Sequence, residues 1–311
     1  MSVPFDLNPN KHSTMSLSWL QQREHGSRAS LGLMVRIATD LGRPAARLLL
    51  YPICAFYLVF AARARRAIKP YLRRVLGRPP RWPDLYRQYF TFASTLLDRV
   101  FFLRGQYERF QIEFHGADFV IEALSHGHGC ILLGSHFGSF EVARAVALMH
   151  QAQEVKLLMY QENAAKIRDV LSAINPELAG FVIETGTPDT MLRVRECLGR
   201  NGLVGLLGDR MLHDKDDIVC QFLGTPARFP RGIMRLIGLL QAPVVLFFSI
   251  YQGGNRYTVH FELLADKIDL SGPDKAAQLQ QWMQRYVDRL EYYCRLAPNN
   301  WFNFFDFWDE L

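Results

Sequence analysis

Short apolar runs alternate with stretches of helical spacing from about residue 107 onwards. Continuous apolar runs predict strands at residues 108–115, 130–135, 156–160, 181–184, 203–208, 244–251 and 257–264. Helical spacing of apolar positions predicts helices at residues 140–150, 164–174, 190–200 and 231–240. Strands and helices that alternate in this way predict an α/β fold, with a mostly parallel central sheet flanked by helices.

One apolar run with basic flanks dominates the pattern of the amino-terminal third. As a helix, residues 48–62 would be about 22 Å long, less than the roughly 30 Å hydrocarbon core of a bilayer, and Pro52 would kink or start that helix. Fourteen Lys and Arg against three acids give residues 23–87 a net charge of +11, while the whole chain carries +6. An interfacial or re-entrant anchor on an anionic membrane surface fits this combination, and a buried core helix is the alternative.

These patterns predict two regions. We expect a helical, membrane-associating region at residues 1–105 and an α/β core at residues 106–311. Within the first region, the Pro- and Arg-rich stretch at 70–81 predicts a break, after which residues 84–104 return to a helical period.

Composition narrows the class of protein. The chain has 311 residues, of which 49% are apolar and 21% charged, as in a folded chain with a large core. Five widely spread cysteines without a CxxC pair predict a chain in a reducing compartment rather than a disulfide scaffold or a zinc ribbon. The first ten residues are polar, so no signal peptide is predicted. The basic window is apolar rather than groove-like, and nucleic acid is not an expected partner.

Spacing excludes several familiar sites. In GHGCIL, which starts at residue 127, leucine stands where a dinucleotide-binding fingerprint needs its third glycine, and the glycines precede the strand. The chain contains neither GxxxxGK[ST] nor HExxH. In GSHFG at residues 134–138 the serine is second rather than central, so covalent serine catalysis is poorly supported.

The segments that follow two buried strands are the best candidates for chemistry, because ligands bind beyond the carboxyl ends of parallel strands. These segments start at His136 and Asp209. His136 and Glu141 form an H-x4-E arrangement, but in one continuous helix they would lie about 140° apart. They can meet if His136 sits in a strand-to-helix turn, for which Gly138 is suited, with Ser139 as the helix N-cap. The carboxylate would then orient an imidazole that acts as a general base.

Four blocks of sequence, in order, carry a family resemblance. They are GCILLGSHFGSFE at 129–141, VGLLGDR at 204–210, FLGTPARFPRGIMRLIGLLQAPVV at 222–245 and PNNW at 298–301. Together they resemble the lysophospholipid acyltransferase-like superfamily and, within it, the bacterial lipid A late acyltransferase branch, over roughly residues 19–308. The Asp-Arg of the second block and the ending NNWFNFFDFW resemble a predicted-acyltransferase subgroup associated with other glycolipids and aryl-polyene-type lipids.

The resemblance implies acyl transfer from a thioester to a hydroxyl, with no metal, no bound cofactor and no covalent acyl-enzyme. It implies that His136 is the general base and Glu141 its orienting partner. Asp209 and Arg210 belong to the second block, where Arg210 would stabilise an oxyanion or hold an acceptor phosphate, or form a local ion pair with Asp209.

Further binding roles are expected on either side of these residues. Gly138 and Ser139 are expected to contact substrate. Arg228 and Arg231, just before a predicted helix, would bind phosphate or be ordinary loop charges.

The expected enzyme is an O-acyltransferase on the cytoplasmic face of the inner membrane. Its donor would be a thioester of acyl carrier protein or coenzyme A, and its acceptor a membrane lipid or glycolipid. A non-catalytic lipid-binding or scaffold protein of the same fold and a thioester hydrolase are the alternatives.

Other polar and aromatic clusters have simpler interpretations. His126 and His128 are expected to be loop residues rather than metal ligands, and residues 213–217 a solvated loop. The six aromatic side chains of residues 301–311 are expected to dock on the core, with an acyl-tunnel wall or an interfacial belt as the alternative.

Overall fold

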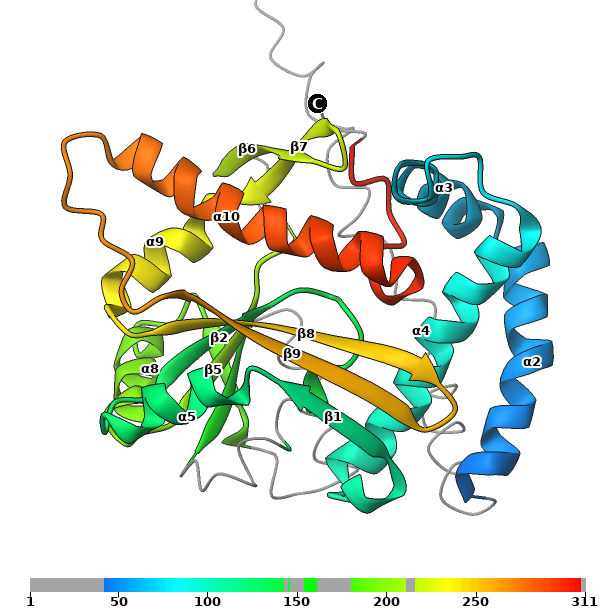
Figure 1. Cartoon of the computed structure of the whole chain (residues 1–311), viewed down its shortest axis with the longest axis horizontal. Helices are drawn as coiled ribbons and strands as arrows, with labels where there is room; N and C mark the ends of the chain where they lie inside the picture. Colours follow the sequence, from blue (N-terminus) through cyan, green and yellow to red (C-terminus); the bar gives the residue numbers. More distant parts are fainter. Residues whose placement is uncertain (1–41, 143–144, 146–153, 161–179, 211–215, 309–311) are drawn as a thin grey trace, which may run out of the picture.

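A seven-stranded sheet forms the centre of the protein (Figure 1). The computed structural model describes residues 42–142, 145, 154–160, 180–210 and 216–308. The strand order is β1-β9-β8-β2-β5-β3-β4, and every neighbouring pair is parallel except β8 and β9. The strands are β1 (Gln111–His115), β2 (Cys130–Gly134), β3 (Val155–Tyr160), β4 (Val182–Thr185), β5 (Leu203–Leu207), β8 (Val244–Gly253) and β9 (Arg256–Ala265). The predicted α/β class with a mostly parallel sheet is confirmed.

The central strands are apolar because both of their faces are covered. All five residues of β2 are buried, as are the first four of β5 and the first eight of β8. Strands covered on both faces read as continuous apolar runs, which is why the sequence located each of the seven to within a few residues.

Helices cover the sheet on both sides. In Figure 1, α10 (Lys275–Leu296) crosses above the strands together with α9 (Arg231–Leu240), and α5 (Ala117–Ser125) lies below them. The hydroxyl of Tyr286, on α10, donates to the carbonyl oxygen of Gly134 at the end of β2, at 2.8 Å. The described part of the core also contains α8 (Thr190–Gly199) and the short 3-10 helices η1 (Tyr107–Arg109), η2 (Phe140–Val142) and η4 (Pro298–Asn300).

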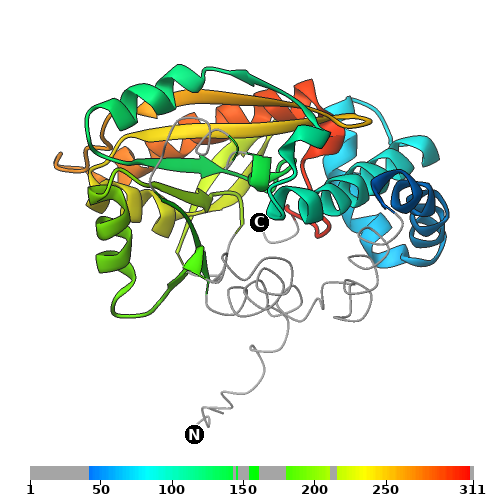
Figure 2. The ribbon, with the colours of Figure 1, turned by 90° about the horizontal axis from the view of Figure 1, so that it is seen from below.

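Among the described residues, three helices precede the core and pack against one end of it, as Figures 1 and 2 show. They are α2 (Gly42–Phe60), α3 (Ala62–Leu76) and α4 (Trp82–Leu103). The break predicted at residues 70–81 is confirmed only in its second half, because Pro70 lies inside α3. Burial explains this difference: Ile68, Tyr71, Leu72 and Val75 form one buried stripe of α3, and this packing outweighs the hydrogen bond that a proline removes.

A two-stranded antiparallel hairpin stands apart from the main sheet and was not predicted from the sequence. Its strands are β6 (Asp217–Phe222) and β7 (Thr225–Pro230). The aromatic carboxyl-terminal segment packs against it: the ring of Phe222 lies 5.3 Å from that of Trp301 and 5.7 Å from that of Trp308. The expected docking of this segment on the core is therefore confirmed for Trp301, which is completely buried.

Four other predictions concern two helices, the division into regions and the cysteines. The helix expected at residues 140–150 starts as η2, and most of its remaining residues lie outside the described part of the chain, as does the helix expected at 164–174. The division into regions at residue 105 stays a prediction. All five cysteines are free and buried.

Candidate active site

Strand order brings two distant segments together. β2 and β5 are parallel neighbours, with Gly134 opposite Leu207 at their last paired position. Because both strands end at the same edge of the sheet, the residues that follow them meet there. His136 comes two residues after β2 and Asp209 two residues after β5, so the edge predicted for chemistry is the edge where these two side chains lie.

His136 and Asp209 are joined by several hydrogen bonds. The imidazole Nδ1 lies 2.8 Å from Asp209 Oδ1. The backbone N–H of His136 donates to the same carboxylate, at 3.1 Å from Oδ1 and 3.0 Å from Oδ2. His136 is therefore held through its backbone and through its ring, and Nε2 has no hydrogen bond to any of the described residues.

The carboxylate of Asp209 is buried and accepts a further bond. Its side chain is 1% exposed, and the indole Nε1–H of Trp301 donates to Oδ2 at 2.8 Å. Burial alone raises the pKa of Asp209, but His136, Arg210 and the Trp301 hydrogen bond together hold that pKa below its ordinary value. Asp209 is thus an anion near neutral pH, and the facing Nδ1 carries a hydrogen.

The environment of His136 favours the neutral imidazole. Burial in the fold lowers the pKa of His136 below its ordinary value of 6.5, and the positive charge of Arg210 lowers it further, while Asp209 acts in the opposite direction. The side chain nevertheless keeps 31% of its surface exposed. With Nδ1 donating to Asp209, a neutral ring has its lone pair on Nε2, the state that a general base requires.

A family model described as bacterial lipid A biosynthesis acyltransferase matches residues 22–309, nearly the whole chain. The chain belongs to this family. The protein is therefore an acyltransferase. A comparison with curated proteins found no match.

The acid that orients the imidazole differs from the one expected in this acyltransferase. Glu141 was expected to hydrogen-bond His136, but its Oε1 lies 2.6 Å from Nε of Arg99, on α4, and its Oε2 accepts from the hydroxyl of Ser139 at 2.9 Å. The partner of His136 is Asp209 instead, and the expected pairing with Glu141 is wrong. The physical reason is that Asp209 follows the neighbouring strand and reaches Nδ1 directly, whereas Glu141 turns towards a cation.

Gly138 and Ser139 shape the turn that carries His136. Gly138 has a φ of +63°, and a Cβ there would lie 1.7 Å from the carbonyl oxygen of Ser249. Glycine is needed for both reasons. Ser139 is buried, and its hydroxyl bonds the Glu141 carboxylate rather than capping a helix. Contact of either residue with substrate stays a prediction.

The three arginines predicted for the site have different surroundings. Arg210 donates from Nη2 to the carbonyl oxygen of Phe302 at 2.9 Å, and its charge acts on His136. Arg228 pairs with Asp217 at 2.8 Å, and Arg231 lies 3.9 Å from Asp216. The last two contacts belong to the base of the β6–β7 hairpin, so phosphate binding by these arginines stays a prediction.

Arg99 is a site residue that sequence reasoning missed. It is half-exposed, pairs with Glu141 and adds a positive charge that lowers the pKa of His136. No motif contains it, because α4 lies well before the α/β core in the sequence. Its link to the site comes from the tertiary structure, in which α4 packs against η2 and so brings Arg99 to Glu141.

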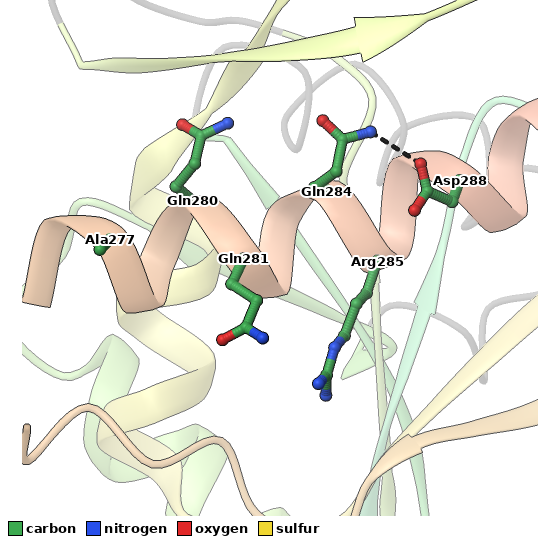
Figure 3. A pocket seen from close by; sticks show the side chains of 6 residues that line it. All are labelled: Ala277, Gln280, Gln281, Gln284, Arg285 and Asp288. Carbon is green, nitrogen blue, oxygen red and sulfur yellow. Dashed lines mark hydrogen bonds between the residues drawn. The ribbon is translucent and has the colours of Figure 1, made fainter.

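A separate surface hollow lies along α10 (Figure 3). Its lining residues are Ala277, Gln280, Gln281, Gln284, Arg285 and Asp288. Gln284 donates to Asp288 Oδ1 at 2.7 Å, and Gln280 donates to the carbonyl oxygen of Val219 on β6 at 2.7 Å. None of these lining residues belongs to the predicted site.

Proposed function

We propose that this protein is an O-acyltransferase that moves a fatty acyl chain from an acyl thioester to a hydroxyl of a lipid or glycolipid acceptor. The donor is an acyl thioester of acyl carrier protein or of coenzyme A. The reaction takes place at the cytoplasmic face of the inner membrane. One observation carries the proposal: the ring of His136 is oriented by a buried carboxylate on Nδ1 and remains partly exposed.

The proposed reaction needs one base and one acid, and His136 supplies both in turn. Nε2 takes the proton of the acceptor hydroxyl while that oxygen attacks the thioester carbonyl carbon. The resulting tetrahedral oxyanion collapses, the C–S bond breaks, and the imidazolium returns its proton to the departing thiolate. The products are an ester and a free thiol. Asp209 stabilises the imidazolium formed midway, as a buried carboxylate beside a catalytic histidine does.

Two arginines supply positive charge next to the base. Arg210 and Arg99 both lower the pKa of His136 through their charges, which places them within electrostatic reach of the ring. Removing one hydrogen-bond donor to a developing oxyanion typically costs about 2.7–4 kcal/mol, or 10²–10³-fold in rate. We assign this role to Arg210, which extends from the segment after β5.

The experiment that tests this function is a transfer assay with purified full-length protein. Acyl carrier protein and coenzyme A thioesters of several chain lengths are each supplied with lipid extracts, and the esterified product is identified by mass spectrometry. Lipids from cells that lack the protein identify the acceptor independently. Release of free fatty acid without acceptor, as fast as transfer, would indicate a hydrolase, and no product from any donor would indicate a scaffold.

Glu141 has its own predicted effect, which acts through Arg99. Replacing Glu141 with Gln removes the carboxylate that pairs with the Arg99 guanidinium at 2.6 Å. The uncompensated cation then disfavours the imidazolium, and Ser139 loses its anionic acceptor. We expect kcat/KM to fall about 10- to 100-fold, measured by initial rates of acyl transfer.

The double variant R99Q/E141Q is the control for this prediction. If Glu141 acts through Arg99, the two losses are not additive, because each single variant already breaks the pair. Additive losses would contradict this role.

The membrane part of the proposal concerns α2. Among the described residues, α2 alone is long and apolar enough to cross a bilayer. Only 22% of its apolar window is buried inside the protein, so most of that window is not covered by the fold. One stripe of it, Ala46, Leu50, Cys54 and Leu58, is buried. Large apolar side chains are exposed on the remaining faces: Leu48, Leu49, Tyr51, Ile53, Phe56, Val59 and Phe60.

The contacts of α2 favour a position in the membrane interface. At its start, Arg43 bonds the buried Asp98 on α4 at 2.7 Å, and Arg47 donates to the carbonyl oxygen of Gly254, at the β8–β9 turn, at 2.7 Å. The amino-terminal end of α2 is therefore tied to the folded core. Exposed cations of α3, at Arg63, Arg66, Lys69 and Arg73, follow directly and suit anionic headgroups.

A charge on the exposed face of α2 should weaken membrane binding. Leu48 is 68% exposed, and Leu48→Glu would place a carboxylate among headgroups and acyl chains. We expect at least about a tenfold lower partition coefficient on phosphatidylglycerol vesicles in a sedimentation assay. Leu192→Glu is the matched control, because Leu192, on α8, is 60% exposed and α8 lies at the opposite end of the molecule in Figure 1. Equal binding of both variants would place the attachment elsewhere.

A further inference from the structure

The segment from Asn300 to Phe302 contacts both strand ends that form the site. On the β2 side, the N–H of Phe302 donates to the carbonyl oxygen of His136 at 2.7 Å. The N–H of Gly138 donates to the carbonyl oxygen of Asn300 at 2.8 Å. On the β5 side, Arg210 donates to the carbonyl oxygen of Phe302 at 2.9 Å. Three consecutive residues near the carboxyl end of the chain thus join the two halves of the site.

Trp301 lies at the centre of this segment. Its ring is completely buried and packs edge-on against Tyr71, Phe222 and Phe307, at centroid distances of 4.8, 5.3 and 5.0 Å. Its Nε1–H donates to Asp209 Oδ2 at 2.8 Å. Asp209 Oδ1 is the oxygen that holds the imidazole, so the indole and the imidazole bind opposite oxygens of one carboxylate.

We propose that Trp301 is a positioning residue for acyl transfer, which acts through Asp209 to set the orientation and basicity of His136. The inference rests on the proposed function. Trp301 does not touch the reacting atoms in this scheme. Its hydrogen bond fixes the plane of the carboxylate and reduces the negative charge that Oδ1 presents to Nδ1.

The donor count at Asp209 explains why this bond matters. The carboxylate accepts from the His136 backbone, the His136 ring and the Trp301 indole. Hydrogen bonds to a buried charge are stronger than bonds between neutral groups. Without the indole, the carboxylate has fewer restraints and a higher charge density, and it stabilises the imidazolium more strongly.

The segment is held from outside the site by the helices that precede the core. Gln88, on α4, is buried and donates to the carbonyl oxygen of Trp301 at 2.7 Å. Tyr71, on α3, donates to the carbonyl oxygen of Pro298 at 2.7 Å. Asn300 Oδ1 accepts from the N–H of Tyr251, on β8, at 2.8 Å. Trp301 is therefore held in place independently of the site.

The test is the variant Trp301→Phe, which keeps an aromatic ring and removes the N–H. We expect kcat to fall about 10- to 100-fold with little change in KM for the thioester. In wild type, activity should be lost as the pH falls through the pKa of His136, which lies below 6.5. This loss forms the acidic limb of the plot of kcat against pH. In the variant this acidic limb should move to higher pH, because the less restrained carboxylate raises the pKa of the imidazole.

Other titratable groups around the pair should not produce this shift. The positive charges of Arg210 and Arg99 act on the ring in wild type, and Trp301→Phe leaves both side chains in place. Tyr286 and Cys294, on α10, also feel the charge of Asp209, but burial raises the pKa of each well above its ordinary value, so both stay neutral. A merely structural role for Trp301 would lower the amount of active enzyme and leave the acidic limb unmoved.

Trp308→Phe is the matched control. Trp308 belongs to the same aromatic cluster, stacked on Phe222, but its buried Nε1 has no hydrogen-bond partner in the described part of the chain. This variant should keep the wild-type kcat and acidic limb. The inference is overturned if Trp301→Phe folds, keeps wild-type turnover and keeps the acidic limb while His136→Gln is inactive. Wild-type activity of His136→Gln would instead overturn the proposed function.

A second route keeps the inference testable if Trp301→Phe does not fold. Cys294 is a natural ligation point, so a synthetic peptide from Cys294 to Leu311 can complete the full chain. Benzothienylalanine at position 301 preserves the bicyclic shape and replaces the N–H by sulfur. The expected result is again lower kcat and an acidic limb at higher pH. An unchanged limb in this folded chain would contradict the inference.

Discussion

Replacing His136 with Gln is expected to reduce acyl transfer by about 10²–10⁴-fold, the range that a general base contributes. Gln can occupy the space of the ring and form hydrogen bonds, but its amide is not basic and cannot take the proton of an alcohol. Initial rates with a saturating thioester, normalised to folded protein, measure the loss. Because His136 keeps 31% of its side-chain surface exposed, the substitution should change stability little.

His128→Gln is the control for this variant. His128 lies just before β2 and is exposed, so the same chemical change there should leave transfer unaffected. Near-normal transfer by folded His136→Gln would remove the general-base mechanism. Equal losses in both variants would point to an effect on β2 rather than on proton transfer.

Asp209→Asn is expected to have the next largest effect, about 10²–10³-fold on kcat. The carboxylate accepts three donors, from the backbone and ring of His136 and from Trp301. An Asn side chain offers one oxygen and one NH₂, so the NH₂ group must face a donor or turn away. If it faces Nδ1, the imidazole takes the other tautomer, with its hydrogen on Nε2, and cannot act as a base.

A buried aspartate elsewhere separates this effect from loss of stability. Asp98 is fully buried and also accepts several donors, from Arg43 and Tyr257. Asp98→Asn should lower Tm and leave kcat per folded molecule unchanged, whereas Asp209→Asn should lower kcat more than its change in Tm explains. Proton NMR of the histidine ring then reports the tautomer directly. A wild-type kcat in Asp209→Asn would show that the imidazole needs no anionic partner.

The sequence predicted the elements that carry the site more reliably than the partners within it. β2 and β5 read as CILLG and LVGLL because a buried parallel strand is apolar on both faces. The ends of these two strands therefore located His136 and Asp209 from the sequence alone. The predicted pairing of His136 with Glu141 rested on the H-x4-E spacing and on the family resemblance, and it is wrong here. Asp209 is 73 residues away along the chain, yet it forms the hydrogen bond.

The hairpin β6–β7 and the place of Pro70 were not predicted for a related reason. β7 contains two of its own prolines, Pro226 and Pro230, and Pro70 stands in α3, so local propensity argues against both elements. Each is stabilised by residues distant in sequence. Phe222 and Phe229 pack on the carboxyl-terminal aromatics, and Tyr71 bonds Pro298. Tertiary packing routinely outweighs propensities of this size.

By itself, the sequence determined the fold class, the family resemblance and the two strand ends where chemistry belongs, because these depend on local apolar patterns and short motifs. Only the tertiary structure decided which carboxylate holds the imidazole, that Arg99 joins the site, and that Trp301 bonds an aspartate 92 residues away. Those choices depend on strand order and on how helices from both ends of the chain pack. A linear pattern carries no distances between segments, and a hydrogen bond forms only where the folded chain brings a donor within about 3 Å of an acceptor.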